Sequence, residues 1–452
     1  MPAARTPAPR ALRLLHPLRD FLRTEAAGGV VLVAAAIAAL VWANVATTSY
    51  DNVWSTVLTI GTSDHHLSLT LREWVNDGLM AIFFFVVGLE IKRELVEGEL
   101  RDPHRAALPA IAAIGGMVVP ALVYVAFNRG GAGADGWGIP MATDIAIAVG
   151  VLSLLGRRVP SPLKLFVLAL AIVDDIGAIA VIAIFYSDYL DARAAAGVAA
   201  CLGAMVLLRV LDVRPLWPYV VLGVGVWLSV HEGGVHATIA GVLLGLLAPT
   251  KPFRRPDLVD ADKLADVSTV ETAHETVVLA RESVSVVERL EHLLHPWSSY
   301  VIVPVFALAN AGVVLSSASI ERAVSSPVTH GVVAGLVVGK FVGIVAFTWL
   351  AVRFGVARLP DRTTFGHILG VAALGGIGFT VSLFVSELAF GTGSTLNDDA
   401  KIGVLAASVT AAALGIVALL VTTRRATSLG DMRCETGLDA TEGPAEASPS
   451  SM

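Results

Sequence analysis

Charged residues and cysteines are both scarce in this sequence, and each shortage excludes a class of protein. Asp, Glu, Lys and Arg make up 15% of the 452 residues, whereas soluble domains carry about 25%. An ordinary soluble fold is therefore excluded. The two cysteines, Cys201 in an apolar run and Cys434 in a polar tail, provide neither a disulfide framework nor the spacing of a metal site. No contiguous basic stretch indicates nucleic acid as a partner.

Hydrophobic residues, by contrast, are abundant and occur in long runs. They form 55% of the chain, and the mean hydropathy is +0.73. A helix needs about 20 apolar residues to cross a bilayer. The pattern predicts an all-α polytopic membrane protein with about twelve transmembrane helices. We expect these spans near residues 27–47, 75–93, 106–127, 138–153, 165–186, 194–211, 216–230, 234–249, 297–316, 329–352, 366–389 and 401–422.

The basic residues between these runs fall in every other loop, which marks the cytoplasmic side and places both termini there. The first apolar run is too long for a signal peptide, so we interpret it as a retained helix. We expect a basic cytoplasmic N-terminus (1–26) and a transmembrane domain (27–425) that contains a cytoplasmic connector (250–296). The polar tail (426–452) is expected to be disordered. Residues 53–70 predict a small extracellular hairpin or an irregular loop.

The most informative stretch contains two neighbouring acids, Asp174 and Asp175, inside the apolar run 165–186. An ionised side chain at the centre of a spanning helix costs on the order of 2.5–3.5 kcal/mol. Neighbours on a helix point about 100° apart, so both acids can border one cavity. The pair predicts an ion or proton site. The alternatives are a structural ion pair or two carboxyls that share a proton.

Two expected spans contain residues that weaken a helix in its middle. The proline lies in span 138–153 and the glycines lie in span 366–389: Pro140, Gly375, Gly376 and Gly378. Thr143 and Asp144 follow the proline closely. Unwound backbone at membrane depth is tolerated where it lines a cavity or is buried in protein. We therefore predict two discontinuous helices that meet at one polar site, although close helix packing alone also explains such glycines.

The two interrupted spans occupy matching places in the sequence. One is the middle of spans 3–5 and the other is the middle of spans 10–12, and the loop charges give the two triplets opposite orientation. This arrangement predicts an inverted repeat with two crossing helices. Interrupted helices at matching positions indicate the substrate site of a transporter.

Span 329–352 contributes a basic residue, Lys340, at its centre. A buried ammonium requires a nearby carboxylate, so we expect Lys340 to approach Asp174, Asp175 or Asp144. Three acids and one base leave surplus negative charge, which a small cation or protons can neutralise by turns. A site that faces either side of the membrane would then exchange cation for proton. A structural salt bridge is an equally strong explanation of Lys340 alone.

Two other functions remain open from the residues alone. A sodium-coupled transporter of organic solutes would need a roomy polar cavity, and no second polar cluster is present. A membrane-embedded aspartyl hydrolase would need two carboxyls about 3 Å apart, and adjacent aspartates on one helix diverge. We therefore do not expect an enzyme, nor a resident cofactor.

Several longer motifs are specific to one family. They occupy residues 84–94 (FFVVGLEIKRE), 140–144 (PMATD), 170–177 (LAIVDDIG), 234–241 (GVHATIAG), 292–297 (HLLHPW) and 309–312 (ANAG). With these motifs, the chain closely resembles the NhaA family of sodium/proton antiporters over residues 21–422. That family is itself an example from which the rule on interrupted helices was drawn, so this agreement is not independent.

The resemblance implies roles for individual residues. Asp175 resembles the main cation ligand, and Asp174 resembles the proton-linked partner of Lys340. Thr143 and Asp144 match residues beside the helix crossing, where Asp144 would balance helix N-termini and Lys340 helix C-termini. Candidates for pH regulation match a cytoplasmic funnel and a histidine near the outer surface: Glu90, Glu94, Glu291, His292 and His236. On the residues alone, His236 is better explained as a packing residue.

The resemblance also implies a function and partners. The family exports Na+ or Li+ across the bacterial inner membrane in exchange for H+, and more protons enter than cations leave. The exchange is therefore electrogenic, and pH regulates it for sodium and pH homeostasis. A homodimer is expected through the extracellular segment 53–70.

Overall fold

The computed structural model describes residues 10–61, 66–156, 159–187, 191–211, 213, 215–250, 284–361 and 363–435. The first half contains α1 (Arg10–Val45), α2 (Thr47–Ser55), β1 (Val57–Gly61), β2 (His66–Thr70), α3 (Leu71–Glu73), η1 (Trp74–Leu79), α4 (Met80–Val96), η2 (Glu99–Arg101), α5 (Pro103–Asn128), η3 (Ala134–Met141), α6 (Ile145–Leu154), α7 (Ser161–Phe185), α8 (Ala192–Val210), α9 (Trp217–Glu232) and α10 (Thr238–Leu247). The second half contains α13 (Val286–Trp297), η6 (Ser298–Ile302), α14 (Val303–Asn310), α15 (Ser317–Ser325), α16 (Pro327–Val333), η7 (Ala334–Gly339), α17 (Lys340–Arg353), α18 (Phe365–Gly375), α19 (Phe379–Phe390) and α20 (Thr395–Glu435).

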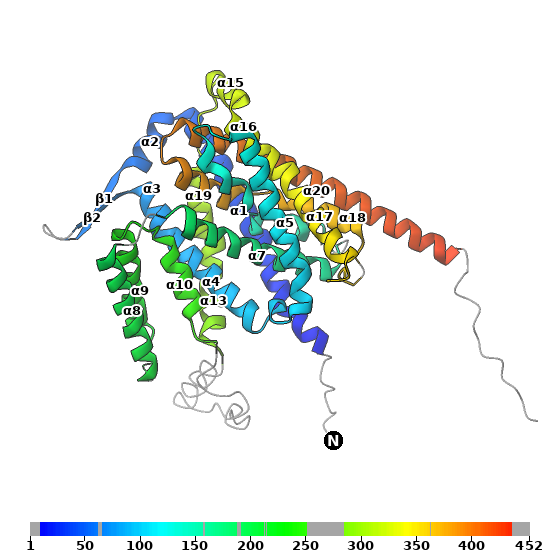
Figure 1. Cartoon of the computed structure of the whole chain (residues 1–452), viewed down its shortest axis with the longest axis horizontal. Coiled ribbons are helices and arrows are strands. Elements are labelled where there is room, and N and C mark those ends of the chain that lie inside the picture. Colours follow the sequence, from blue (N-terminus) through cyan, green and yellow to red (C-terminus); the bar gives the residue numbers. More distant parts are fainter. Residues whose placement is uncertain are drawn as a thin grey trace, which may run out of the picture.

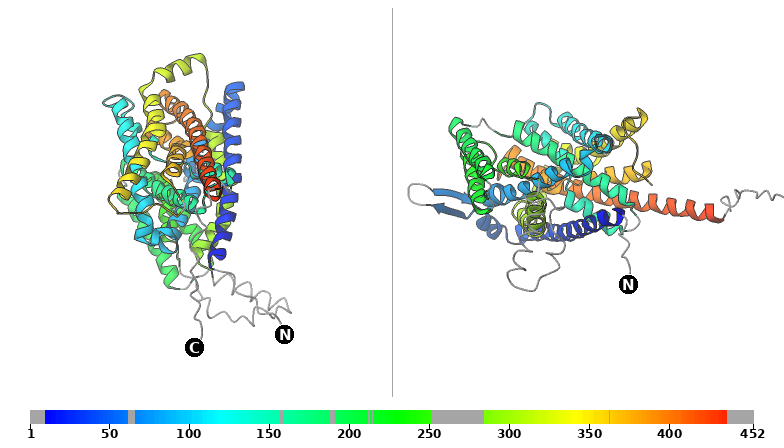
Figure 2. Two further views of the ribbon diagram at one scale, coloured as in Figure 1. Left: turned by 90° about the vertical axis from the view of Figure 1, so that its right-hand side faces the viewer. Right: turned by 90° about the horizontal axis from the view of Figure 1, so that it is seen from below.

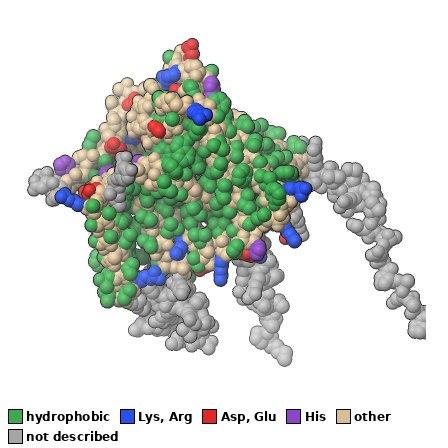
Figure 3. All heavy atoms as spheres, viewed as in Figure 1, with side chains coloured by type: hydrophobic (Ala, Val, Ile, Leu, Met, Phe, Trp, Pro, Cys, Tyr) green, Lys and Arg blue, Asp and Glu red, His purple; other side chains and the backbone are tan. Residues whose placement is uncertain are grey.

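The helices form a bundle whose outer surface is apolar. Within the described residues, seven helices are long and apolar enough to cross a membrane, and the pair α18 and α19, bent by 41°, makes an eighth if it counts as one span. Hydrophobic side chains cover the middle of the face in Figure 3, and Lys and Arg gather along its lower margin. Because lipid tails solvate apolar surface, this distribution is typical of a protein embedded in a bilayer.

The count of twelve spans stays a prediction. Four of the expected spans correspond to helices α4, α9, α10 and α14, which have 17, 16, 10 and 8 residues. These are shorter than the roughly 20 residues that cross a bilayer. Two of the four continue a neighbouring π-helical turn, since η1 leads directly into α4 and η6 leads into α14.

Residues 53–70 do form a hairpin over their described part. β1 and β2 pair antiparallel, with Val57 opposite Thr70 and Gly61 opposite His66, and residues 62–65 lie outside the described residues. Every residue of β1 is exposed. Figures 1 and 2 show the hairpin projecting from one side of the bundle.

Helices reach into the expected polar segments at both ends of the chain. α1 begins at Arg10, and its part that is apolar and long enough to cross a membrane is Ala26–Val45, so the boundary expected after residue 26 stays a prediction. α20 continues to Glu435 and extends beyond the bundle in Figures 1 and 2, so residues 426–435 are helical where we expected disorder. No proline occurs between Thr395 and Pro444, so the helix has no covalent reason to stop at the end of the apolar run. Residues 436–452 and most of the connector, 251–283, lie outside the described residues.

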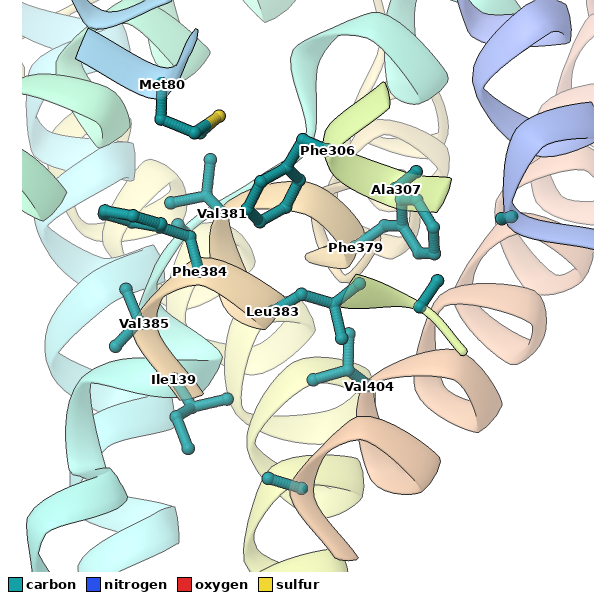
Figure 4. Packing of buried hydrophobic residues seen from close by; sticks show 14 of the residues in the cluster. Met80, Ile139, Phe306, Ala307, Phe379, Val381, Leu383, Phe384, Val385 and Val404 are labelled. Atoms are coloured by element: carbon teal, nitrogen blue, oxygen red, sulfur yellow. The ribbon is translucent and has the colours of Figure 1, made fainter. Parts of the chain in front are cut away.

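The two largest hydrophobic clusters of the described residues both receive side chains from α7. Its first half supplies Phe166 and Leu170 to one cluster, and its second half supplies Ala178 and Ile182 to the other. The second of these clusters also contains the α19 side chains shown in Figure 4, which pack around Phe306. Asp174 and Asp175 therefore lie between two apolar layers rather than at the lipid surface.

Helices α5 and α17 approach each other until their backbones touch. A Cβ atom on Gly343 would lie 2.1 Å from the carbonyl oxygen of Gly115, and one on Gly115 would lie 2.4 Å from the oxygen of Gly343. Small residues at both positions permit this contact, as they do between other membrane helices. The contact fixes α17, and therefore Lys340 at its start, relative to α5.

We predict that Gly343→Val destabilises the protein by about 1–3 kcal/mol, the usual cost of overpacking a close contact. The matched control is Gly203→Ala on α8, where an added Cβ meets nothing within 4 Å. This control should be neutral or slightly stabilising, because alanine favours helix over glycine. Thermal unfolding of both purified variants in detergent tests the prediction, and equal midpoints would contradict the backbone contact.

Candidate functional site

A buried ion pair joins α7 to α17. The ammonium of Lys340 donates hydrogen bonds to Asp174 Oδ2 and to Thr143 Oγ1. Lys340 is 0% exposed and Asp174 is 1% exposed, so water screens neither charge. Removing one member of such a pair leaves an uncompensated buried charge, so each residue is stable in its charged form only when the other is present. The expected carboxylate partner of Lys340 is thus Asp174.

The π-helical turn η7 and the following helix α17 place Lys340 at this point. η7 ends at Gly339, one residue before the lysine. π-Turns within α-helices occur frequently at functional sites, because the extra residue redirects the side chains that follow. A Cβ on Gly376 would lie 2.5 Å from the carbonyl oxygen of Leu336 in η7. Glycine at position 376 therefore permits the second interrupted helix to lie against the turn that presents Lys340.

The two interrupted helices contact each other where they are broken. Residues 142–144 are extended between η3 and α6, and residues 376–378 separate α18 from α19. The backbone N–H of Asp144 donates to the carbonyl of Ile377 at 2.6 Å. Thr143 Oγ1 donates to the carbonyl of Gly375 at 3.0 Å. Backbone groups freed by one break thus find partners in the other, as buried polar groups require.

The carboxylate of Asp144 lies at the start of two helices. Its Oδ1 accepts a hydrogen bond from the backbone N–H of Ile147 at 3.0 Å, in the first turn of α6. Its Oδ2 accepts from the N–H and the hydroxyl of Thr380, at 3.0 and 2.7 Å, in the first turn of α19. A helix N-terminus carries about half a positive elementary charge. Two of them together offset the charge of Asp144.

The link between Lys340 and a helix C-terminus runs through a side chain. α18 ends at Gly375, whose carbonyl accepts the hydrogen bond from Thr143. The same Thr143 hydroxyl accepts a hydrogen bond from Lys340. Thr143 therefore connects the ammonium to the negative end of α18.

Asp175 lines a small cavity that also has polar side chains in its wall. The cavity measures about 50 Å³. One water molecule needs about 10–15 Å³ by a comparable measure, so the space holds a few waters or one partly hydrated small cation. Its polar lining also includes Glu90, Thr143, Asp144, His295, Ser298 and Thr380. Asp174 and Lys340 do not line the cavity, although Thr143 touches both the ion pair and the cavity.

Beyond the cavity, α4 and α13 carry a second group of charges. Arg93 donates a hydrogen bond to Glu291 and lies 3.4 Å from Glu94 Oε1. Glu291 is 5% exposed, and its Oε2 has no hydrogen-bond partner among the described residues. Burial raises the pKa of Glu291, and the neighbouring Arg93 opposes that shift. The Glu90 carboxylate lies 3.8 Å from His295 Nε2.

The structure separates the two histidines of the 292–297 motif. His292 is exposed, whereas His295 is buried and lines the cavity. His295 is a site residue that we did not predict from the sequence. Glu291 and His295 are four residues apart and so share one helix face, while His292 points about 100° away. That spacing was a signal available in the sequence.

The remaining candidate, His236, lies outside this region. It is half-buried in the short segment between α9 and α10. It interacts electrostatically with Asp77, which also faces His231 Nδ1 at 3.9 Å. The structure therefore brings together Asp174, Asp175, Asp144, Thr143 and Lys340, and it places His236 in a different cluster.

Membrane-length helices, a buried ion pair and an acid-lined cavity define the chain as a multi-pass helical membrane protein with an ionisable site between its helices. A family model described as Na+/H+ antiporter 1 matches residues 19–419. The chain is 48% identical over 410 residues to the Na(+)/H(+) antiporter NhaA 3 of Frankia alni, with 89% of this chain and 88% of that protein covered. It is 47% identical over 423 residues to the Na(+)/H(+) antiporter NhaA of Rhodopirellula baltica, with 91% of this chain and 95% of that protein covered. The chain therefore belongs to the NhaA family of Na+/H+ antiporters, as its motifs indicated.

A double-mutant cycle tests the ion pair. We predict that Lys340→Met and Asp174→Asn each destabilise the protein by about 3–5 kcal/mol, because each leaves one buried charge without its partner. The double variant Lys340→Met/Asp174→Asn should recover most of that loss, since both charges of the pair are then absent. Thermal unfolding of the three purified variants gives the coupling, and additive losses would show that the two groups do not stabilise each other.

Proposed function

We propose that this protein exchanges Na+ for H+ at Asp175, exporting sodium as protons enter. The observation that supports it most strongly is the balance of charge at the site. Asp174 is neutralised by Lys340, and Asp144 is offset by the N-termini of α6 and α19. These contacts balance the charges of Asp174 and Asp144 but not the charge of Asp175, which lines the cavity.

Exchange follows because one surplus charge accepts one cation at a time. A sodium ion or a proton at Asp175 makes the site neutral, whereas both together would make it positive. A dehydrated site with unbalanced charge is costly to move through the membrane. Only the loaded, neutral forms then reorient readily, which couples the exit of sodium to the entry of protons. Li+ carries the same charge on a smaller ion and should be accepted as well.

Electrogenic exchange needs a second proton site. The Asp174–Lys340 pair is the strongest candidate, because a proton gained or lost there changes the charge of the same buried group of residues. Thr143 joins this pair to the cavity, so the two sites are only one hydroxyl apart. We propose that the pair opens when the cation binds and closes when it leaves.

The geometry argues against both alternative functions. A cavity of about 50 Å³ leaves no space for an organic solute beside the cation. A hydrolase would need two carboxyls that share a proton. Here Asp174 is bound to Lys340, and both oxygens of Asp144 accept hydrogen bonds from helix N-termini.

We also propose the architecture that the family suggests, with twelve spans, an inverted repeat of spans 3–5 and 10–12, and interrupted helices that cross. The contacts between the two breaks favour the crossing. The lower margin of Figure 3, rich in Lys and Arg, would face the cytoplasm with both termini. The exposed strand β1 offers an unpaired edge through which two hairpins could form a homodimer.

For pH regulation we propose the charges of α4 and α13 as one unit: Glu90, Glu94, Arg93, Glu291 and His295. His295 takes the place that we expected for His292, because it lines the cavity whereas His292 is exposed. At low pH the buried Glu291 is protonated and its attraction to Arg93 is weak. Rising pH ionises Glu291 and tightens the pair, which we propose accompanies activation.

We predict that Asp175→Asn abolishes Na+-dependent proton movement while the protein still inserts, because an amide neither binds a proton nor supplies negative charge. Proteoliposomes with an internal pH dye, tested against Na+, Li+ and K+ gradients under a voltage clamp, measure the exchange. The matched control is Glu321→Gln, an exposed acid on α15, which should exchange at the parental rate. Normal exchange in Asp175→Asn would remove Asp175 from the mechanism.

We predict that Glu291→Gln shifts the onset of transport to higher pH without lowering the maximal rate. Because burial raises its pKa, Glu291 favours the folded state below the usual carboxyl pKa of about 4.3, and this stabilisation is lost as pH rises through the raised value. Glutamine has no proton to lose, so the thermal midpoint of the variant should fall less between pH 4 and that value. Superimposable rate and stability profiles of variant and parent would contradict a role for Glu291.

A further inference from the structure

A second buried ion pair lies at the end of α19 farthest from the site. Lys401 Nζ lies 3.3 Å from Glu387 Oε2, and the side chains are 5% and 8% exposed. Asn397 Nδ2 donates to the same Glu387 oxygen at 2.7 Å, and Thr392 Oγ1 donates to the other. Ser386 Oγ donates to Asn397 Oδ1 at 2.9 Å. These contacts join the last turn of α19 to the first turns of α20.

The same region of α20 is bound to two further helices. Arg322 of α15 donates to Asp399 Oδ1 at 3.0 Å. Thr329 Oγ1 of α16 donates to the carbonyl of Asp399 at 2.9 Å. Figure 1 places α15 and α16 at the upper end of the bundle and α13 at the lower end. The network therefore ties together four helices at the end of the bundle opposite to α13, the helix that contributes His295 to the cavity.

Glu387 is an unfavourable choice for a helix cap. It lies in the last turn of α19, where the helix dipole is negative and repels an acid. It is also buried, and a buried carboxylate is costly unless it is paired. A residue needed only for packing or capping would not carry this charge. We conclude that the role of a glutamate at position 387 is to pair with Lys401.

Apolar packing separates this network from the ion site. Phe384 lies between Phe84 and Phe306. Its ring centroid is 5.5 Å from that of Phe84 and 6.2 Å from that of Phe306. Figure 4 shows these α19 side chains filling the space between the helices. Thr380 and Glu387 are seven residues apart, so they lie on roughly one face of α19 with about 10 Å of helix between them. One end of this rigid element holds Asp144 and the other holds Lys401.

We propose that Glu387, with Lys401 and Asn397, is a positioning cluster that latches the face opposite the cavity. While the latch is closed, α19 stays against α20 and the aromatic layer blocks access from that face. The site then opens only toward Glu90 and His295. Release of the Glu387–Lys401 pair lets the outer half of α19 move and exposes the site on the other side. This proposal rests on the proposed exchange, because the latch controls when the site opens to one side of the membrane or to the other.

The test measures access to α19 from each face. Cys201 and Cys434 are replaced by serine, and Val385→Cys, a buried position between the latch and the site, reports access. A membrane-impermeant thiol reagent is added to each side in turn. We expect Glu387→Gln and Lys401→Gln each to raise labelling from the α15 face about tenfold, within the range of allosteric couplings. Lys401→Arg preserves the charge pair and should label as slowly as the parent.

Glu321→Gln, an exposed acid on the same face, is the matched control and should leave labelling unchanged. If a single variant fails to fold, Glu387→Gln/Lys401→Gln, which removes both charges of the pair, takes its place with the same expected result. Unchanged labelling in folded variants, or an equal rise from both faces, would overturn the latch, because general loosening has no sidedness. Labelling requires no sodium flux, so the latch and the proposed exchange fail or stand separately.

Discussion

The ion pair between Lys340 and Asp174 is the contact on which the other features of the site depend. Two opposite charges with almost no access to water are stable only together. The pair requires α7 and α17 to be held at a fixed distance. Both helices pack closely on α5, α17 through Gly343 against Gly115 and α7 through Gly177 against Met117. Because Lys340 pairs with Asp174, it leaves the neighbouring Asp175 as one of the acids that line the cavity, together with Glu90 and Asp144. Where Lys340, Asp174 and Asp175 are all ionised, these three groups together carry a single net negative charge.

The interrupted helices serve the same electrostatic purpose. Each break exposes backbone N–H and C=O groups that a continuous helix would satisfy internally. Here the freed donors bind Asp144 and the freed carbonyls bind Thr143 and the Asp144 backbone. The breaks therefore supply the dipole charge that a membrane interior lacks. One helix, α19, links this site to the second ion pair. Thr380 in its first turn binds Asp144, and Glu387 in its last turn pairs with Lys401.

Much of the site was predictable from the sequence because charge and glycine within apolar runs are rare and costly. Asp174, Asp175, Lys340 and the two breaks all stand out on that ground. His295, Thr380 and the Glu387–Lys401 pair do not, because their importance depends on which face of a helix points inward and which other helix lies there. For the same reason we expected His292 rather than His295 near the site, because the sequence alone does not show which of the two faces inward. The helical residues 426–435 show that polar composition alone does not end a helix. The family relationship agrees with the motifs. The number of spans depends on the lengths of the shorter apolar helices, and composition sets the ends of a helix only to within a few residues.

Sodium and protons, in the mechanism proposed for this protein, occupy the same carboxylate by turns. Equilibrium binding of radioactive Na+ to the purified protein in detergent, measured across a range of pH without any membrane gradient, tests this most directly. Competition for one site predicts that the apparent Kd for Na+ rises about tenfold for each unit of falling pH while the site is protonated, with no change in the number of sodium ions bound at saturation. A Kd that stays constant across the same range would mean that both ions are held together, and it would contradict exchange at Asp175.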